Sequence, residues 1–126
     1  MSDPEDAAGP PTEIELQRLF VQLVAKLIDY AYQNPHYTLR FGEAYRTPEQ
    51  AAWNAAHGAG IAHTLHTERL AIDLLLDIDY VWQTSTEAYR PLGEYWKSLH
   101  PLARWGGDFV SRPDGNHFSL AYGGRA

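Results

Sequence analysis

Apolar residues recur at intervals of three and four along the first quarter of the chain, and this spacing predicts a long amphipathic helix. The helix is expected to begin at Thr12, because Thr12 and Glu15 have the spacing of a capping box. It should continue for about five turns, to Tyr32. Residues 1–11 are acidic and rich in Ala, Gly and Pro, so they are expected to form a flexible leader.

Two more helices are predicted from capping signals. Residues 47–50 supply an N-cap threonine, a proline at the first helical position and a glutamine at the third, which begins a helix running to about His57. A third helix is expected between Ser85 and Leu99. Its Pro91 fits only near the beginning of a helix. The apolar stripe of this helix would consist of Tyr89, Leu92, Tyr95, Trp96 and Leu99.

Alternation of apolar and polar residues predicts strands between these helices. Residues 37–41 should form one strand whose odd-numbered side chains, Phe41 included, face inward. In a strand over residues 70–76, the even-numbered side chains would face the core. Asp73 would then lie on the opposite face.

The last third of the chain is expected to contribute the rest of the sheet. Residues 105–110 are interpreted as a turn that leads into a short strand, and residues 112–116 as a tight turn with Pro and Gly at turn positions. Residues 117–121 should form a final strand with Phe118 in the core and His117 on the opposite face. Together these elements predict a small single α+β domain over residues 12–126, with helices packed on a short antiparallel sheet.

Composition and charge narrow the function classes. Hydrophobic residues make up 44% of the chain and aromatic residues 13%, which favours a folded globule. The net charge of -6 gives no reason to expect nucleic acid as a partner. The chain has no cysteine, which excludes disulfides and thiolate metal sites. No apolar run approaches the ~20 residues of a membrane span, and residues 1–11 do not resemble a secretory signal, so synthesis in the cytoplasm is expected.

His66, Asp73 and His117 are candidate ligands of one zinc ion, because imidazole and carboxylate are ligand types of catalytic zinc, which takes three from the protein. The residues from His66 to Asp73 would span roughly 23 Å if extended. Ligands of one zinc lie within about 4 Å of each other. The chain must therefore turn back at the polar residues 67–69, with His66 on a loop and Asp73 on the next strand. His57 and His63 are rival ligands, and Asp73 could instead form a cap or salt bridge at a strand edge.

The order of these motifs resembles a known family. The sequence is similar to the zinc D-alanyl-D-alanine carboxypeptidases and L-alanyl-D-glutamate endopeptidases, particularly the compact bacteriophage endolysins. The resemblance rests on three motifs in the same order: His66 through Ala71 to Asp73, then Trp105-Gly106-Gly107-Asp108, then Asp114 followed by His117-Phe118. Residues 44–50 resemble the arginine motif of the same family. The resemblance extends from about residue 41 to residue 119.

The resemblance implies a role for each matching residue. His66, Asp73 and His117 would bind Zn²⁺, Asp114 would act as general base, and Arg46 would bind the carbonyl oxygen of the substrate. Asp108 competes with Asp114 for the role of base, but its place after two glycines favours a structural carboxylate in a turn.

Two positions depart from the family pattern. Thr64 replaces a serine and keeps its hydroxyl group. Arg69 replaces a glycine, and because arginine disfavours positive φ, the turn before the strand is expected to be built differently.

The function that this resemblance implies is hydrolysis of peptidoglycan stem peptides by a monomeric endolysin, an L-alanyl-D-glutamate endopeptidase that causes lysis of the host cell. It would act on the cell wall from the periplasmic side and would reach it with help from a holin. A D-alanyl-D-alanine carboxypeptidase is the first alternative. An inactive wall-binding or virion structural protein is the second.

Overall fold

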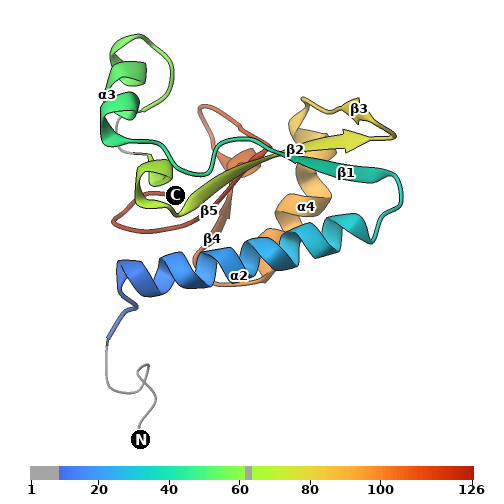
Figure 1. Ribbon diagram of the computed structural model, residues 1–126, viewed down its shortest axis with the longest axis horizontal. Helices are drawn as coiled ribbons and strands as arrows, with labels where there is room; N and C mark the ends of the chain where they lie inside the picture. Colours follow the sequence, from blue (N-terminus) through green and yellow to red (C-terminus); the bar gives the residue numbers. More distant parts are fainter. Residues whose placement is uncertain (1–8, 62–63) are drawn as a thin grey trace, which may run out of the picture.

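The structure is a computed structural model that describes residues 9–61 and 64–126. Its first helix, α2 (Glu13–Tyr32), begins at the predicted capping box (Figure 1). Thr12 Oγ1 accepts a hydrogen bond from the Glu15 backbone N–H at 3.2 Å, and the Glu15 carboxylate accepts one from the Thr12 backbone at 3.0 Å. Most of the predicted leader lies outside the described residues. The buried face of α2 consists of Leu16, Phe20, Leu23, Val24, Leu27 and Ala31.

The strands form one antiparallel sheet, which confirms the predicted α+β domain. Four strands lie side by side in the order β1 (Tyr37–Phe41), β2 (Ala71–Ile78), β5 (His117–Leu120) and β4 (Ala103–Trp105). The short β3 (Val81–Trp82) pairs with the far end of β2. In the register of β2 with β5, Asp73 lies directly opposite His117.

Helices α2 and α4 (Thr86–Ser98) pack against the sheet and share its hydrophobic core. The Trp96 ring of α4 packs edge-to-face with Phe20 of α2 and with Phe118 of β5. The distances between the ring centroids are 5.7 Å and 6.1 Å. The Trp96 indole N–H donates to the backbone carbonyls of Arg104 and Ser119 at 3.0 and 3.1 Å. This tryptophan therefore fixes α4 to β4 and β5.

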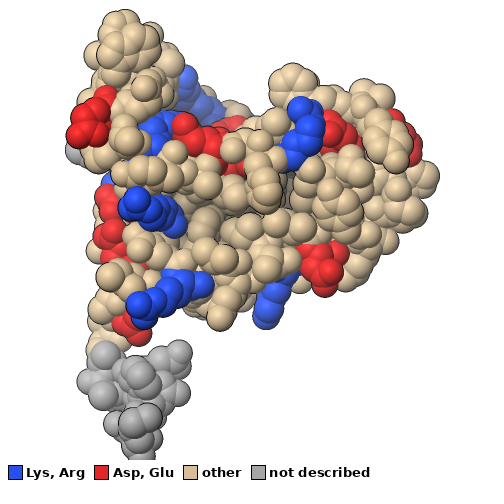
Figure 2. All heavy atoms as spheres, viewed as in Figure 1, with Lys and Arg blue, Asp and Glu red and all other residues tan. Residues whose placement is uncertain are grey.

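Helix α3 (Pro48–Ala56) projects from the rest of the molecule, as Figures 1 and 2 show. It begins at the predicted N-cap, where Thr47 Oγ1 accepts from the Gln50 backbone N–H at 3.1 Å. On the face drawn in Figure 2, acidic and basic side chains are interspersed and form no large patch of one sign. No helix in the described ranges is long and apolar enough to cross a membrane.

Three predictions about the elements are wrong in detail. Phe41 is 74% exposed rather than inward, because β1 is an edge strand and its last residue is covered on one side only. The strand near Trp105 precedes the two glycines instead of following them, and Gly106–Asp108 forms a 3₁₀ turn. Pro91 lies in the second turn of α4, where it cannot donate the usual helical hydrogen bond to Glu87.

The position of the glycines after β4 has a steric cause. A Cβ atom on Gly106 would lie 2.1 Å from the Asp114 carbonyl oxygen and 2.8 Å from His117 Cβ. The backbone of residue 106 must therefore approach the turn before β5 more closely than any side chain permits. That contact joins segments that are distant in the sequence, so local alternation does not reveal it.

Candidate metal centre and active-site cleft

The structure brings together the three predicted ligands, His66, Asp73 and His117. His66 Nε2 lies 3.3 Å from Asp73 Oδ1, and His117 Nδ1 lies 3.6 Å from the same oxygen. One potential ligand atom from each residue lies within 4.8 Å of the other two. Donor atoms of a tetrahedral zinc site are about 3.3 Å apart, given metal–ligand bonds near 2 Å, so the spacing suits a single divalent ion.

The burial and charge of His66, Asp73 and His117 also suit the binding of a cation. The two imidazoles are almost fully buried, and Asp73 Oδ1 is a buried atom without a hydrogen-bond partner among the described residues. Burial alone would raise the pKa of Asp73, but the neighbouring His117 and His66 outweigh it and hold the pKa at about 2. The site thus presents an ionised carboxylate between two imidazoles, which is a zinc-type donor set.

The fold gives each candidate ligand a defined position. Asp73 and His117 face each other because they are directly paired residues of neighbouring antiparallel strands. His66 lies in a short 3₁₀ helix, η1 (Leu65–Glu68), whose N-cap Thr64 accepts a hydrogen bond from the His66 backbone at 3.3 Å. The chain then reverses before β2, as its reach requires.

The reversal is made by Arg69 itself, so the expectation of a differently built turn is wrong. Arg69 adopts the left-handed conformation that a glycine would take, with φ 58° and ψ 32°. This conformation costs about 1–2 kcal/mol for a residue with a side chain. The Arg69 guanidinium lies 3.9 Å above the Tyr45 ring. That cation–π contact offsets part of the cost and ties the turn to the segment that carries Arg46.

The rival ligands do not join the group. His57 caps α3, where its Nδ1 lies 2.7 Å from the Trp53 carbonyl oxygen and its ring stacks on the Trp53 indole at 3.8 Å. His63 lies outside the described residues. Within the part of the chain that the structure describes, the group of His66, Asp73 and His117 is the candidate metal centre.

A cleft of about 480 Å³ surrounds the candidate centre, and both predicted catalytic residues line it. Arg46 precedes α3 and is held by its backbone N–H, which donates to the His66 carbonyl at 3.1 Å. Its guanidinium forms an ion pair with Glu43. Asp114 lies in the turn before β5, and its carbonyl accepts from the His117 backbone N–H at 3.1 Å.

The cleft shifts the acidity of Asp114. Partial burial raises the pKa of Asp114, and the negative charge of Asp73 raises it further, against the opposing effect of His117 and His66. A carboxyl group whose pKa is raised toward the working pH can both accept and return a proton, which is the requirement for a general base that later acts as an acid.

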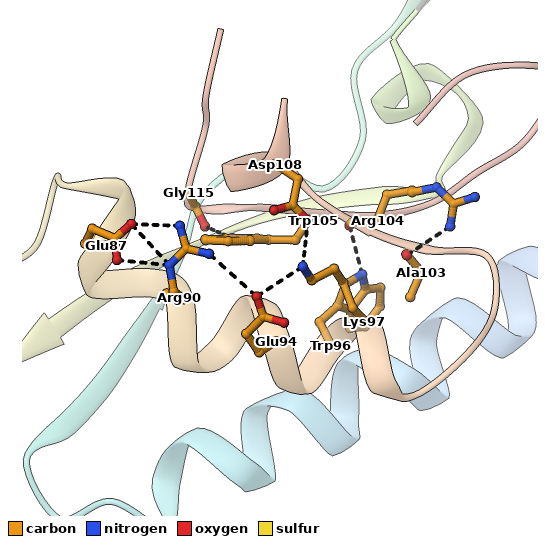
Figure 3. Close-up of polar contacts among 10 residues, drawn as sticks. All are labelled: Glu87, Arg90, Glu94, Trp96, Lys97, Ala103, Arg104, Trp105, Asp108 and Gly115. Atoms are coloured by element: carbon orange, nitrogen blue, oxygen red, sulfur yellow. Dashed lines mark hydrogen bonds and ion pairs between the residues drawn. The ribbon is translucent and has the colours of Figure 1, made fainter. Parts of the chain in front are cut away.

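Asp108, the competitor for this role, takes part in a different set of contacts. Figure 3 shows its carboxylate pointing toward α4, where Asp108 Oδ2 lies 2.7 Å from Lys97 Nζ. Lys97 also contacts Glu94 at 3.1 Å, and Arg90 continues the row of ion pairs to Glu87. These contacts fit a structural carboxylate that fastens the turn after β4 to α4.

Trp105 connects the same helix to the turn of Asp114. Its indole N–H donates to the Gly115 carbonyl at 2.7 Å (Figure 3). The ring packs against Gly93 of α4 and against Gly107, where an added Cβ would lie 2.1 and 2.2 Å from it. The buried indole therefore supports the backbone next to Asp114.

Sequence reasoning missed two charged residues of the site. Glu43 lies three residues before Arg46, a spacing that could have suggested the pair. Arg125 lines the cleft from the end of the chain and contacts Glu68 at 3.3 Å. Nothing local in the sequence marks Arg125, because its contact with Glu68 joins segments that are distant in the sequence.

Comparisons with known proteins agree with this arrangement. A protein-family model described as D-alanyl-D-alanine carboxypeptidase matches residues 57–120, slightly more than half of the chain. Among solved structures, the chain is similar to the crystal structure of the Serratia marcescens L-Ala D-Glu endopeptidase ChiX, with a TM-score of 0.61 and 17% sequence identity. The alignment covers 86% of each chain, and at this identity it establishes the fold. No curated protein matches the chain.

Proposed function

Because the chain belongs to the D-alanyl-D-alanine carboxypeptidase family, and is therefore a peptidase acting on peptidoglycan, we propose that it is a zinc-dependent L-alanyl-D-glutamate endopeptidase. The observation that carries the proposal is the convergence of His66, Asp73 and His117 with Asp114 and Arg46 in one cleft. In this proposal the first three residues hold the zinc ion. The other two act on the substrate.

The chemistry of each side chain determines its role in the proposed reaction. When bound, zinc supplies Lewis acidity, which lowers the pKa of a water molecule toward ~7 and polarises the scissile carbonyl group. Asp114 accepts the proton of the attacking water and then returns it to the leaving amine. The Arg46 guanidinium donates to the carbonyl oxygen, where negative charge develops as the tetrahedral intermediate forms.

Two lines of support favour the endopeptidase among the reactions of this family. The similar ChiX structure is named an L-Ala D-Glu endopeptidase, and it matches most of the chain. The motif order of the sequence resembles that of the compact endolysins, and this resemblance supports the further proposal that the enzyme is a bacteriophage endolysin. The description of the family model favours the second candidate, a D-alanyl-D-alanine carboxypeptidase with the same residues in the same roles.

Digestion of purified peptidoglycan separates the two reactions. We expect the zinc-loaded enzyme to produce new D-Glu amino termini and to leave L-alanine on the muramyl side, because the proposed cut lies inside the stem peptide. Mass spectrometry of the released fragments measures this. Free D-alanine together with otherwise intact stems would instead establish the carboxypeptidase.

A further inference from the structure

Glu43 occupies a position between a proposed metal ligand and the proposed carbonyl-binding arginine. Its Oε1 atom forms the ion pair with the Arg46 guanidinium and lies 3.9 Å from His66 Nδ1. The side chain as a whole is 37% exposed, but this oxygen is buried. One carboxylate oxygen of Glu43 thus faces two functional groups of the cleft.

The backbone holds Glu43 at this place through the centre itself. The Asp73 backbone N–H donates to the Glu43 carbonyl at 2.9 Å, and the Gly42 N–H donates to the Asp73 carbonyl at 2.8 Å. A Cβ atom on residue 42 would lie 2.9 Å from Asp73 Cβ, so glycine permits the close approach. Together with the bond from Arg46 N–H to the His66 carbonyl, these contacts attach residues 42–46 to two of the three ligands.

The His66 ring needs a partner on this side. Its Nε2 atom faces Asp73, whereas its Nδ1 atom is buried and has no hydrogen-bond partner in the described part of the chain. A neutral imidazole that binds a metal through Nε2 carries its proton on Nδ1. An unpaired buried N–H is unfavourable, and metal-bound histidines almost always donate this proton to a carboxylate, a carbonyl or water.

We propose that Glu43 is a positioning residue, whose carboxylate accepts the His66 Nδ1–H when zinc is bound and at the same time holds the Arg46 guanidinium in the cleft. The proposal rests on the proposed function, because it takes His66 as a zinc ligand. A movement of about 1 Å would bring the two atoms to hydrogen-bond distance. A negatively charged acceptor makes His66 a better ligand by fixing its tautomer and raising its basicity.

Zinc affinity tests this role without reference to activity. Competition with a chelator gives the zinc dissociation constant of the full chain and of its variants. Loss of such a partner typically weakens metal binding 10–100-fold, and we expect this for Glu43→Ala. Glu43→Gln keeps the shape and a carbonyl acceptor but loses the charge, so its zinc affinity should fall between those of the wild type and Glu43→Ala. Glu49→Gln, an exposed change of the same chemistry on α3, should bind zinc like the wild type.

The position of the proton is a second readout that a merely structural role would not move. In the zinc-loaded protein, ¹H–¹⁵N spectra of the histidine rings should show a slowly exchanging Nδ1–H that is assigned to His66. Glu43→Ala should make that proton exchange faster. The inference would be overturned if both Glu43 variants kept the wild-type zinc affinity and an unchanged exchange rate of the Nδ1 proton, and His66→Ala still lost zinc. Full zinc binding by His66→Ala would overturn the proposed metal site itself, and the inference with it.

Discussion

The Asp114→Asn variant is expected to hydrolyse peptidoglycan about 10²–10⁴-fold more slowly than the wild type, because an amide cannot accept the proton of the attacking water. It should still bind zinc, since Asp114 lies outside the group of His66, Asp73 and His117. The rate of clearing of a peptidoglycan suspension measures the first quantity, and metal analysis of the purified variant measures the second.

The same variant should have a more stable metal-free fold. The pKa of Asp114 is raised in the folded protein, so the folded state binds its proton more tightly than the unfolded state does. Ionisation above the ordinary pKa of an aspartate therefore lowers the stability of the metal-free fold, and the neutral amide avoids this loss. We expect a higher melting temperature for Asp114→Asn than for the wild type at neutral pH, both without metal.

Asp108→Asn is the matched comparison. It removes the charge of one of the two carboxylates that contact Lys97 and should lower the melting temperature more than it lowers turnover. The opposite pattern, with an active Asp114→Asn and a folded but inactive Asp108→Asn, would exchange the roles of the two carboxylates.

The second large effect concerns the ligands. His66→Ala and His117→Ala should each lose stoichiometric zinc, and hydrolysis with it, because two remaining ligands do not complete a catalytic zinc site. Metal analysis of the wild type should give one zinc per chain. His57→Ala serves as the control, since His57 is exposed and stacks on Trp53 away from the group. If both ligand variants kept full zinc, the assignment would be wrong.

Local signals in the sequence were sufficient where the cause is local. Thr12 and Glu15 predicted the beginning of α2 because a capping box involves only residues three apart. The length of the extended chain from His66 to Asp73 predicted that the chain reverses between them, without any knowledge of the sheet. The structure places that reversal at Arg69, against the preference of arginine for negative φ, and the supporting Tyr45 ring comes from another segment.

Features that depend on the order of the strands could not be predicted in this way. Phe41 alternates correctly along β1, but its exposure follows from the edge position of that strand. Glu43 reaches His66 only because residues 42 and 43 continue the pairing of β1 with β2 as far as Asp73. The candidate ligands could be proposed from their residue types, whereas Glu43, which faces one of them, could be found only from the fold.

The most direct test of a zinc-dependent peptidase centred on His66, Asp73 and His117 is the response of hydrolysis to the metal. Purified enzyme is stripped with a chelator, freed of the chelator, and assayed on purified peptidoglycan before and after one equivalent of Zn²⁺ is added. We expect the stripped wild type to be inactive and to recover with zinc, and His66→Ala to remain inactive under the same treatment. Full hydrolysis by the stripped enzyme, or full recovery of His66→Ala with one equivalent of zinc, would contradict the account.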